Sequence, residues 1–380
     1  MLKKKPVNVL FLAATLPIGG AERTWIDFIP FLDKEKFNPV VLCFKEKSYF
    51  GEEMQRRGVT VIDRFMKSKY DLSVLWRLVR FMTNHDIQIV YTLDHDDAMF
   101  WGRIAARLAR VPVCLTVNHT TYRRDGKDTM NSAGKLLMPL TDKIIATAQG
   151  SYDHLLAQGI PERKLHLIVN GVDIDGLLYK KSETNLKKSD FNIPCDAKVV
   201  GILATFKPEK AHVAVFLEAA DMILKKCPNT YFLLVGDGVE RPRIEQKMKK
   251  LGLEEHVIIT GFREDASDIL GVLDISTLAS FPKVETFSLA ILESMAVGLP
   301  IVVTDVGSLD EMVIDHENGY VVPPCNPEAF ADAIVKILKD DRLAEDMGKK
   351  SQKFAIEKFH RNRMTTDTEA LFDMLLRQKN

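Results

Sequence analysis

Residues 281–307 read FPKVETFSLAILESMAVGLPIVVTDVG, and this stretch combines the patterns of a loop, a helix and a strand. An apolar-rich segment with helical spacing runs through its centre and stops at Gly298 and Pro300. Glu285 precedes that segment, and Glu293 lies eight residues further on, inside it. At about 100° per residue the two carboxylates come within roughly 80° of each other, which predicts that both border one cleft at the head of the helix.

The start of this helix also offers backbone N–H groups. We expect the amides of Phe287, Ser288 and Leu289 in the first helical turn, where unsatisfied N–H groups and the helix dipole favour phosphate. This arrangement suits a sugar diphosphate. The alternative interpretation is structural: Glu285 is a solvated loop residue, Glu293 belongs to a polar helix face, and the helix only packs.

The composition is that of a globular protein with about two domains. The chain has 380 residues, 46% of them hydrophobic and 27% charged. Its five cysteines form no Cys-x-x-Cys pair, which disfavours a disulfide framework or a zinc site and is typical of a reducing cytosol. No apolar run of roughly 18 residues occurs, and the apolar stretch near the amino terminus is better explained as a buried strand than as a signal peptide. A cytoplasmic protein is predicted.

Short β-branched apolar runs alternate with helical patterns along the whole chain. Runs of this kind separated by helices indicate parallel strands covered on both faces, so two series indicate two doubly wound α/β domains. A polar, Lys-rich stretch at 170–197 separates the series and is predicted to connect the domains, the alternative being a long surface loop. The predicted strands are 7–14, 39–44, 59–62, 87–93, 111–117, 143–148 and 165–169 in the first series, and 198–204, 231–236, 256–261, 273–278, 300–304 and 319–322 in the second.

The segment 285–324, ETFSLAILESMAVGLPIVVTDVGSLDEMVIDHENGYVVPP, resembles the donor-site signature of glycosyltransferase family 4, retaining sugar transferases of the GT-B fold. The resemblance implies two Rossmann-like domains facing a cleft, with the acceptor site largely on the first and the nucleotide-sugar site on the second. It places the first domain at 1–178, the second at 179–361, and a carboxyl-terminal helix at about 362–380 back on the first domain. Glu285 is then expected to contact the sugar, and Glu293 to accept hydrogen bonds from the ribose.

Two glycines follow the first predicted strand. Gly19 and Gly20 allow positive φ and close approach of backbone amides to a ligand at the start of a helix, although a Gly-Gly pair alone is weak evidence. Their GGAE form resembles the family's glycine loop, which approaches the donor diphosphate and sugar. His119, just past the fifth strand, resembles the family's cleft histidine, which contacts the transferred sugar; a structural or solvated histidine is the alternative.

The loop after the fourth strand is rich in acidic residues around His95. At the carboxyl edge of a parallel sheet it can contact the acceptor, hold a metal ion through Asp94 and Asp96, or simply cap the next helix. Capping is the favoured interpretation and no metal is predicted. By the resemblance, Asn170 and Asp173 lie in the segment that ends the first domain and lines the cleft.

A basic stretch beside apolar residues lies near residue 130. It would suit an anionic membrane surface or a lipid-linked acceptor, and an ordinary surface helix is the alternative. Its cations are Arg123, Arg124, Lys127 and Lys135.

The second domain departs from the family at the position of the diphosphate-binding arginine. Lys210 matches the lysine that neutralises the donor diphosphate, but Thr205 occupies the place of the family's arginine. Arginine provides a bidentate fork where threonine has one hydroxyl, so another cation has to compensate, and Lys207 is the candidate.

Further along, two segments resemble nucleotide-binding loops. Gly236 and Gly238 form a turn that is either structural or a ligand approach. The backbone near Phe262 and Arg263 resembles the loop that meets the nucleobase edge.

The sequence therefore predicts a retaining hexosyl-type glycosyltransferase. It is expected to move a sugar from a nucleoside diphosphate sugar, with a UDP-sugar favoured over a GDP-sugar, to a hydroxyl of a glycan or lipid-linked acceptor. Cell-envelope polysaccharide or lipopolysaccharide synthesis is the expected setting, with peripheral contact at the inner face of the cytoplasmic membrane. His119, Lys210 and Glu285 are the predicted catalytic residues. No cofactor and no nucleic acid partner are expected. A degenerate nucleotide-sugar-binding protein and another GT-B enzyme, such as an epimerase or a phosphorylase, are the alternatives.

Overall fold

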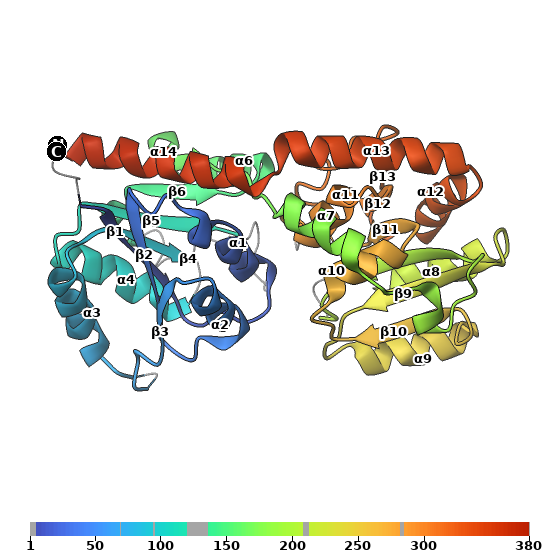
Figure 1. Cartoon of the computed structure of the whole chain (residues 1–380), viewed down its shortest axis with the longest axis horizontal. Helices are drawn as coiled ribbons and strands as arrows, with labels where there is room; N and C mark the ends of the chain where they lie inside the picture. Colours follow the sequence, from blue (N-terminus) through green and yellow to red (C-terminus); the bar gives the residue numbers. More distant parts are fainter. Residues whose placement is uncertain are drawn as a thin grey trace. The chain divides into compact units, whose positions relative to one another are not determined.

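The computed structural model describes residues 5–68, 70–93, 96–119, 136–207, 213–281 and 285–379. Within these ranges the chain forms two compact units (Figure 1). The first unit contains the described residues up to 171 together with 361–379, and the second contains those of 172–360. The division falls seven residues before the predicted boundary at 178, because helix α7 (Ile174–Glu183) packs against α10 and α11 of the second unit.

A seven-stranded parallel sheet forms the centre of the first unit, in the order β3-β2-β1-β4-β5-β6-β7. All seven predicted strands are present, which confirms this half of the fold prediction. Their bounds are β1 Val7–Ala13, β2 Phe37–Cys43, β3 Thr60–Ile62, β4 Ile87–Leu93, β5 Val113–Asn118, β6 Lys143–Ala146 and β7 Leu165–Leu167.

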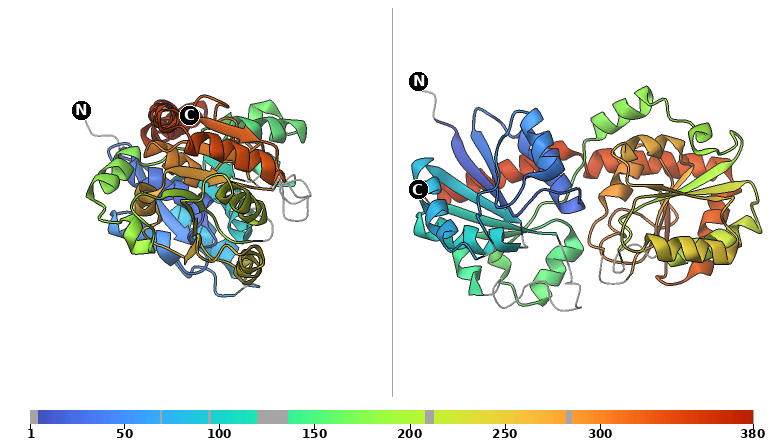
Figure 2. Two further views of the ribbon diagram at one scale, coloured as in Figure 1. Left: turned by 90° about the vertical axis from the view of Figure 1, so that its right-hand side faces the viewer. Right: turned by 90° about the horizontal axis from the view of Figure 1, so that it is seen from below.

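Helices cover both faces of this sheet (Figure 2). Alternate residues of β1 point to opposite sides: Phe11 packs with α1, α2 and α14, while Leu12 packs with α3 and α4. This period of two follows from the pleat, and it explains why strands buried on both faces read as continuous apolar runs. The helices are α1 Gly20–Phe28, α2 Ser48–Arg56, α3 Ser73–Asn84, α4 Asp96–Leu108, α6 Gln149–Ala157 and α14 Arg361–Lys379.

Helix α14 is the last segment of the chain and belongs to the first unit. Its Phe372 is fully buried, with ring centroids 5.5 Å from Phe37 and 6.3 Å from Tyr91. Near its end, Lys379 Nζ lies 2.7 Å from the Asp142 carboxylate. Residues from the two ends of the sequence therefore share one hydrophobic core.

The second unit is built on a six-stranded parallel sheet in the order β10-β9-β8-β11-β12-β13. Its six predicted strands are also present, so the prediction of two doubly wound α/β domains is confirmed. The strands are β8 Lys198–Leu203, β9 Thr230–Val235, β10 Val257–Gly261, β11 Ile275–Leu278, β12 Ile301–Thr304 and β13 Gly319–Val322. The remaining helices are α8 Val213–Leu224, α9 Arg241–Leu251, α10 Ala266–Ile269, α11 Leu289–Ala296, α12 Pro327–Leu338 and α13 Asp341–Lys358.

The stretch 170–197, predicted to connect the domains, is not the plain surface loop of the alternative interpretation. It contains α7 and a short 3₁₀ helix, Lys188–Phe191. The Lys188 ammonium donates to the Asp274 carboxylate at 3.0 Å, which ties this stretch to the second unit. In the part of the chain that the structure describes, no helix has both the length and the apolar character needed to cross a bilayer.

Candidate functional site

In both sheets the order of the strands reverses at one point, and ligands of doubly wound folds bind beside that point at the carboxyl ends of the strands. In the second unit β8 and β11 are neighbours there, and the chain leaves them in opposite directions. The loop after β8 carries Thr205 and Lys207, and the loop after β11 leads to Glu285. The topology therefore brings together residues that the sequence placed in one donor site.

Helix α11 begins at Leu289, two residues later than predicted. Ser288 is its N-cap: the Ser288 Oγ accepts a hydrogen bond from the Ile291 amide at 3.3 Å, and its backbone is extended. Of the three amides predicted for the first turn, only that of Leu289 lies in it. The prediction was wrong for Phe287 and Ser288, because a serine side chain that takes an amide of the third helical residue fixes the helix start at itself.

The cap can be tested by two substitutions at one position. Ser288→Ala should lower the free energy of unfolding by about 1 kcal/mol, because the Ile291 amide loses its acceptor. Ser288→Gly should cost only about a few tenths of a kcal/mol, since glycine is itself tolerated at N-caps. Denaturant unfolding measures both, and equal losses would show that the Ser288 hydroxyl does not stabilise α11.

Glu285 lies in the loop before α11 and is half-buried, whereas Glu293 lies within the helix and is also half-buried. The angular estimate made from helical spacing therefore does not apply to this pair, because only one of the two residues is helical. Between them, the Phe287 ring is buried and packs edge-on against Phe359 at 5.6 Å.

The turn after β12 supports the backbone of Glu285, a contact that sequence reasoning missed. The Ser308 amide donates to the Thr286 carbonyl at 2.9 Å. Gly307 has φ +63°, and a Cβ at that position would overlap the carbonyl oxygen of Glu285. Glycine is thus required for the close approach of the two segments. The signal in the sequence is only a glycine after a strand, which does not say what it approaches.

The chain after β8 alternates between exposed and buried residues. Thr205 and Lys207 are exposed, and Phe206 between them is fully buried. Phe206 and Lys207 line a cavity of about 180 Å³ together with residues of α8 and α9 and with Phe281. Lys207 is therefore exposed two residues after Thr205, and its role as the substitute cation stays a prediction. Lys210 lies outside the described residues.

The two glycines after β9 serve the fold. Gly236 and Gly238 have φ +144° and +157°. A Cβ at either would overlap a backbone carbonyl oxygen of the neighbouring segment, that of Ala204 or of Phe206. The sequence left open a structural turn and a close approach to a ligand. The overlaps with backbone atoms explain both glycines by the structural turn.

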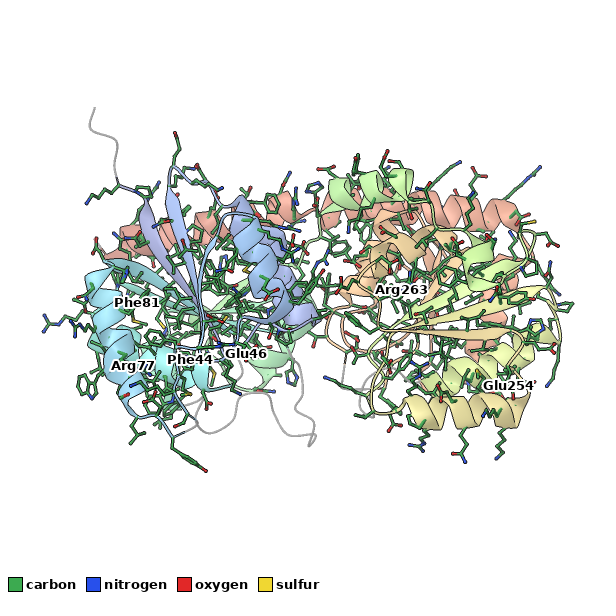
Figure 3. All side chains as sticks on the ribbon, turned by 60° about the horizontal axis from the view of Figure 1, so that its bottom comes forward. Phe44, Glu46, Arg77, Phe81, Glu254 and Arg263 are labelled. Carbon is green, nitrogen blue, oxygen red and sulfur yellow. The ribbon has the colours of Figure 1, made fainter. Side chains whose placement is uncertain are left out.

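Phe262 and Arg263 follow β10 at the same carboxyl edge. Arg263 is labelled in Figure 3. The Phe262 side chain is 53% exposed. The Arg263 guanidinium makes two hydrogen bonds to Asp265, at 2.7 and 2.6 Å, and this pairing holds the pKa of the Asp265 carboxyl below its ordinary value. The arginine side chain is thereby held by its own loop, and the contact of this loop with a base stays a prediction.

In the first unit the glycine loop follows β1, a strand beside the reversal of strand order. Gly19 is the N-cap of α1, with φ −163° and ψ 158°, and Gly20 is its first residue. Neither residue uses the positive φ that glycine allows, because an N-cap is extended and the next residue is already helical. A Cβ at Gly20 would meet open space, whereas one at Gly19 would overlap the Glu22 carboxylate.

Polar residues gather around the end of β5. His119 follows this strand and is half-buried. The preceding residue, Asn118, accepts hydrogen bonds from Ser151 Oγ at 3.2 Å and, through its carbonyl, from Thr147 Oγ1 at 3.4 Å. The amide of the buried Asn170 donates to the Thr147 carbonyl at 3.1 Å. The loops after β5, β6 and β7 thus form one polar network beside His119, which the sequence did not indicate.

Several predicted residues have other roles or lie outside the structure. Asp173 is the N-cap of α7, accepting from the Gly176 amide at 3.0 Å, and its cleft role stays a prediction. His95, Asp94, Arg123, Arg124, Lys127 and Lys135 lie outside the described residues. Among the residues that are described, no three His, Cys, Asp or Glu side chains come together as metal ligands do.

Two family patterns match the chain. The pattern described as Glycosyltransferase Family 4 matches residues 18–175, and that described as Glycosyl transferases group 1 matches residues 183–354. The two matches adjoin the division between the structural units.

Two named relatives match over most of their length. The chain is 25% identical over 327 residues to the N-acetyl-alpha-D-glucosaminyl L-malate synthase of Bacillus anthracis, covering 83% of this chain and 82% of that protein. It is 24% identical over 359 residues to the UDP-Gal:alpha-D-GlcNAc-diphosphoundecaprenol alpha-1,3-galactosyltransferase of Escherichia coli, covering 90% of each.

A solved structure with the same fold is that of Anabaena HepE in complex with UDP, at a TM-score of 0.83 and 22% identity, covering 97% of this chain and 100% of that one. HepE has also been solved with UDP-glucose. This likeness confirms the GT-B architecture. Fold, family patterns and relatives agree, and the chain belongs to the group 1, family 4 glycosyltransferases, enzymes with the GT-B fold.

Proposed function

We propose that this glycosyltransferase takes its sugar from a UDP-sugar bound at the carboxyl edge of the second sheet. The observation that carries the proposal is the placement of Glu285, Glu293 and Lys207 around the β8–β11 reversal, where doubly wound folds bind nucleotides. The E. coli relative is named for UDP-Gal and HepE has been solved with UDP-glucose, which supports uridine over guanosine.

In this proposal the head of α11 faces the diphosphate. The Ser288 hydroxyl binds the Ile291 amide and not that of Leu289. The Leu289 amide and the positive end of the helix dipole favour negative charge at this point. Lys207 and Lys210 add positive charge, and Glu293 accepts hydrogen bonds from the ribose hydroxyls. The backbone at Phe262 and Arg263 meets the base.

The chemical step is transfer with retention of anomeric configuration. The bond between the anomeric carbon and the diphosphate oxygen breaks, and a bond to the acceptor hydroxyl oxygen forms on the same face of the sugar. The acceptor proton passes to the leaving phosphate. Lys207, Lys210 and the helix-head amides stabilise the charge that develops on the diphosphate, which is usually the largest catalytic contribution. Glu285 and His119 contact the transferred sugar, and no metal or cofactor takes part.

The acceptor is a glycan or a lipid-linked glycan bound mainly by the first unit, near His119, Asn170 and the glycine loop. Relatives named for a diphosphoundecaprenol acceptor, for poly(ribitol-phosphate) and for lipopolysaccharide core synthesis support a cell-envelope setting. The enzyme then works in the cytoplasm at the inner face of the membrane.

A thermal-shift panel tests the donor. UDP, GDP, ADP and their common sugar conjugates are added to wild type and to Glu293→Ala. A UDP compound present at about a hundred times its dissociation constant should stabilise the wild type by roughly 2.7 kcal/mol, and this shift should be lost in Glu293→Ala.

The matched control is Glu254→Ala, which removes an exposed glutamate before β10 and should keep the shift (Figure 3). Stabilisation by GDP compounds alone would overturn the uridine preference. Failure of every nucleotide to stabilise the wild type would overturn the donor site.

A further inference from the structure

Three large apolar side chains are exposed within a short stretch around the start of α3. Tyr70 is 84% exposed, Leu72 is 70% exposed and Trp76 is 67% exposed. Leu72 and Trp76 are four residues apart at the head of a helix, so their side chains are neighbours on its surface. We call these three residues the Tyr70–Trp76 patch. Single exposed apolar residues need no explanation, but adjoining large ones mark interaction surfaces.

The patch is held in place by a defined turn. The Asp71 carboxylate accepts hydrogen bonds from the Lys67 amide at 2.9 Å, from Ser73 Oγ and from the Arg77 guanidinium. The bond from Ser73 and that from the Lys67 amide hold the pKa of Asp71 below its ordinary value. The apolar side chains around Asp71 are therefore presented to solvent by an ordered backbone.

The opposite side of α3 packs into the core of the first unit. The patch is not part of that core. Figure 3 shows Arg77 and Phe81 on α3, on the side of Phe44. Phe81 packs against the core cluster that contains Phe44. The Arg77 guanidinium covers the Phe65 ring at 5.1 Å. The buried residues of α3 are Val74, Leu78 and Met82, so the core contacts of the helix do not include Trp76.

Cations outnumber acidic residues around the patch. Residues 64–81 contain five lysines or arginines and one acidic residue, Asp71; of the cations, Arg77 is paired with Asp71 and Arg64 with Glu46. Lys67 is exposed before the patch, and Arg80 is exposed one helical turn after Trp76. Tyrosine and tryptophan prefer the interface between a bilayer and water, and flanking cations attract anionic lipid.

The patch also lies at the functional edge of its sheet. It follows β3, so it stands at the carboxyl end of a strand, as do the glycine loop after β1 and His119 after β5. A lipid surface at this edge would present an acceptor headgroup to the side of the sheet that carries the predicted acceptor residues.

We propose that the Tyr70–Trp76 patch docks the enzyme on an anionic lipid bilayer. The proposal rests on the lipid-linked acceptor of the proposed function, but docking itself requires no turnover. Trp76, Leu72 and Tyr70 enter the interfacial region, and Lys67 and Arg80 contact the lipid phosphates.

Co-sedimentation of the full chain with vesicles tests the proposal. Vesicles of phosphatidylcholine and phosphatidylglycerol in equal parts should bind the wild type, and pure phosphatidylcholine should bind it more weakly. Trp76→Ser should lower the partition coefficient at least about tenfold, through lost apolar contact. Lys67→Gln should lower it about fivefold on the anionic vesicles. Tyr179→Ser, which removes an equally exposed aromatic residue from α7 of the second unit, should leave it unchanged.

Fluorescence gives a second measurement. Trp76 is the exposed member of the three tryptophans, since Trp25 is buried and Trp101 half-buried. Anionic vesicles should shift the wild-type emission to the blue, and Trp76→Phe should abolish the shift while keeping most of the binding. Unchanged binding by Trp76→Ser, or no wild-type binding to anionic vesicles, would overturn the proposal.

Two further outcomes separate this proposal from others. A wild-type dimer that dissociates in Trp76→Ser, measured by sedimentation without lipid, would assign the patch to a second copy of the chain and overturn lipid docking. A UDP thermal shift without vesicle binding would overturn the docking surface and leave the proposed donor site in place. Vesicle binding without any nucleotide shift would overturn the donor site and leave the docking surface in place.

Discussion

Glutamine in place of Glu285 is expected to lower kcat by about a hundredfold or more, with little change in KM. The substitution keeps the size of the side chain and removes its negative charge. In sugar transfer, positive charge develops at the anomeric carbon, so a carboxylate beside the sugar stabilises the transition state more than the bound substrate. An interaction made mainly in the transition state appears in kcat rather than in KM.

Initial rates with a UDP-sugar donor measure this effect. Glu254→Gln is the matched control, because it makes the same chemical change at an exposed position and should keep wild-type rates. The Glu285→Gln protein should also keep its thermal shift with UDP, which shows an intact nucleotide site. A kcat within twofold of wild type would remove Glu285 from the catalytic machinery.

Alanine in place of Gly307 should lower kcat/KM by about a hundredfold, although residue 307 touches no substrate in the proposed mechanism. Its Cβ would overlap the carbonyl oxygen of Glu285 and lie 3.2 Å from that of Thr286, so the loop that carries Glu285 has to move. Displacement of a catalytic group by about 1 Å can cost this much.

Gly252→Ala is the control that separates displacement of the Glu285 loop from backbone strain at a left-handed residue. Gly252 has φ +67°, close to the +63° of Gly307, but a Cβ there would meet no atom within 4 Å. Gly252→Ala should lose about 1–2 kcal/mol of stability because alanine disfavours the left-handed region, and Gly307→Ala should lose at least as much, since its Cβ also meets backbone atoms. Only Gly307→Ala should lose activity. If the two variants retain the same kcat/KM, the turn after β12 does not position Glu285.

The fold was predictable because its signals are local. A strand buried on both faces needs a run of apolar residues such as those of β1, and each such run lies within a few residues of sequence. All thirteen strands were found this way, and with them the two carboxyl edges that carry the candidate residues.

The details of the site depend on contacts between distant segments, which no local pattern reports. Nothing around Gly307 says that its neighbour in space is Glu285, and nothing around Asn118 says that Ser151 and Thr147 share its hydrogen bonds. The start of α11 was misplaced for a related reason. Ser288 could be helical or a cap by sequence, and the choice depends on how its side chain meets the Ile291 amide.

The return of α14 to the first unit has a consequence for biosynthesis. The core of that unit includes Phe372, and the Asp33 amide donates to the Glu369 carboxylate across 336 residues of sequence. During translation the first 171 residues therefore emerge before α14, the helix that covers part of their sheet. The second unit, contiguous from 172 to 360, has all of its own residues before that moment. Domains commonly complete their folding from the amino terminus onward. In this enzyme the second unit can therefore be completed on the ribosome before α14 emerges, while the first unit is completed only once α14 has been synthesised.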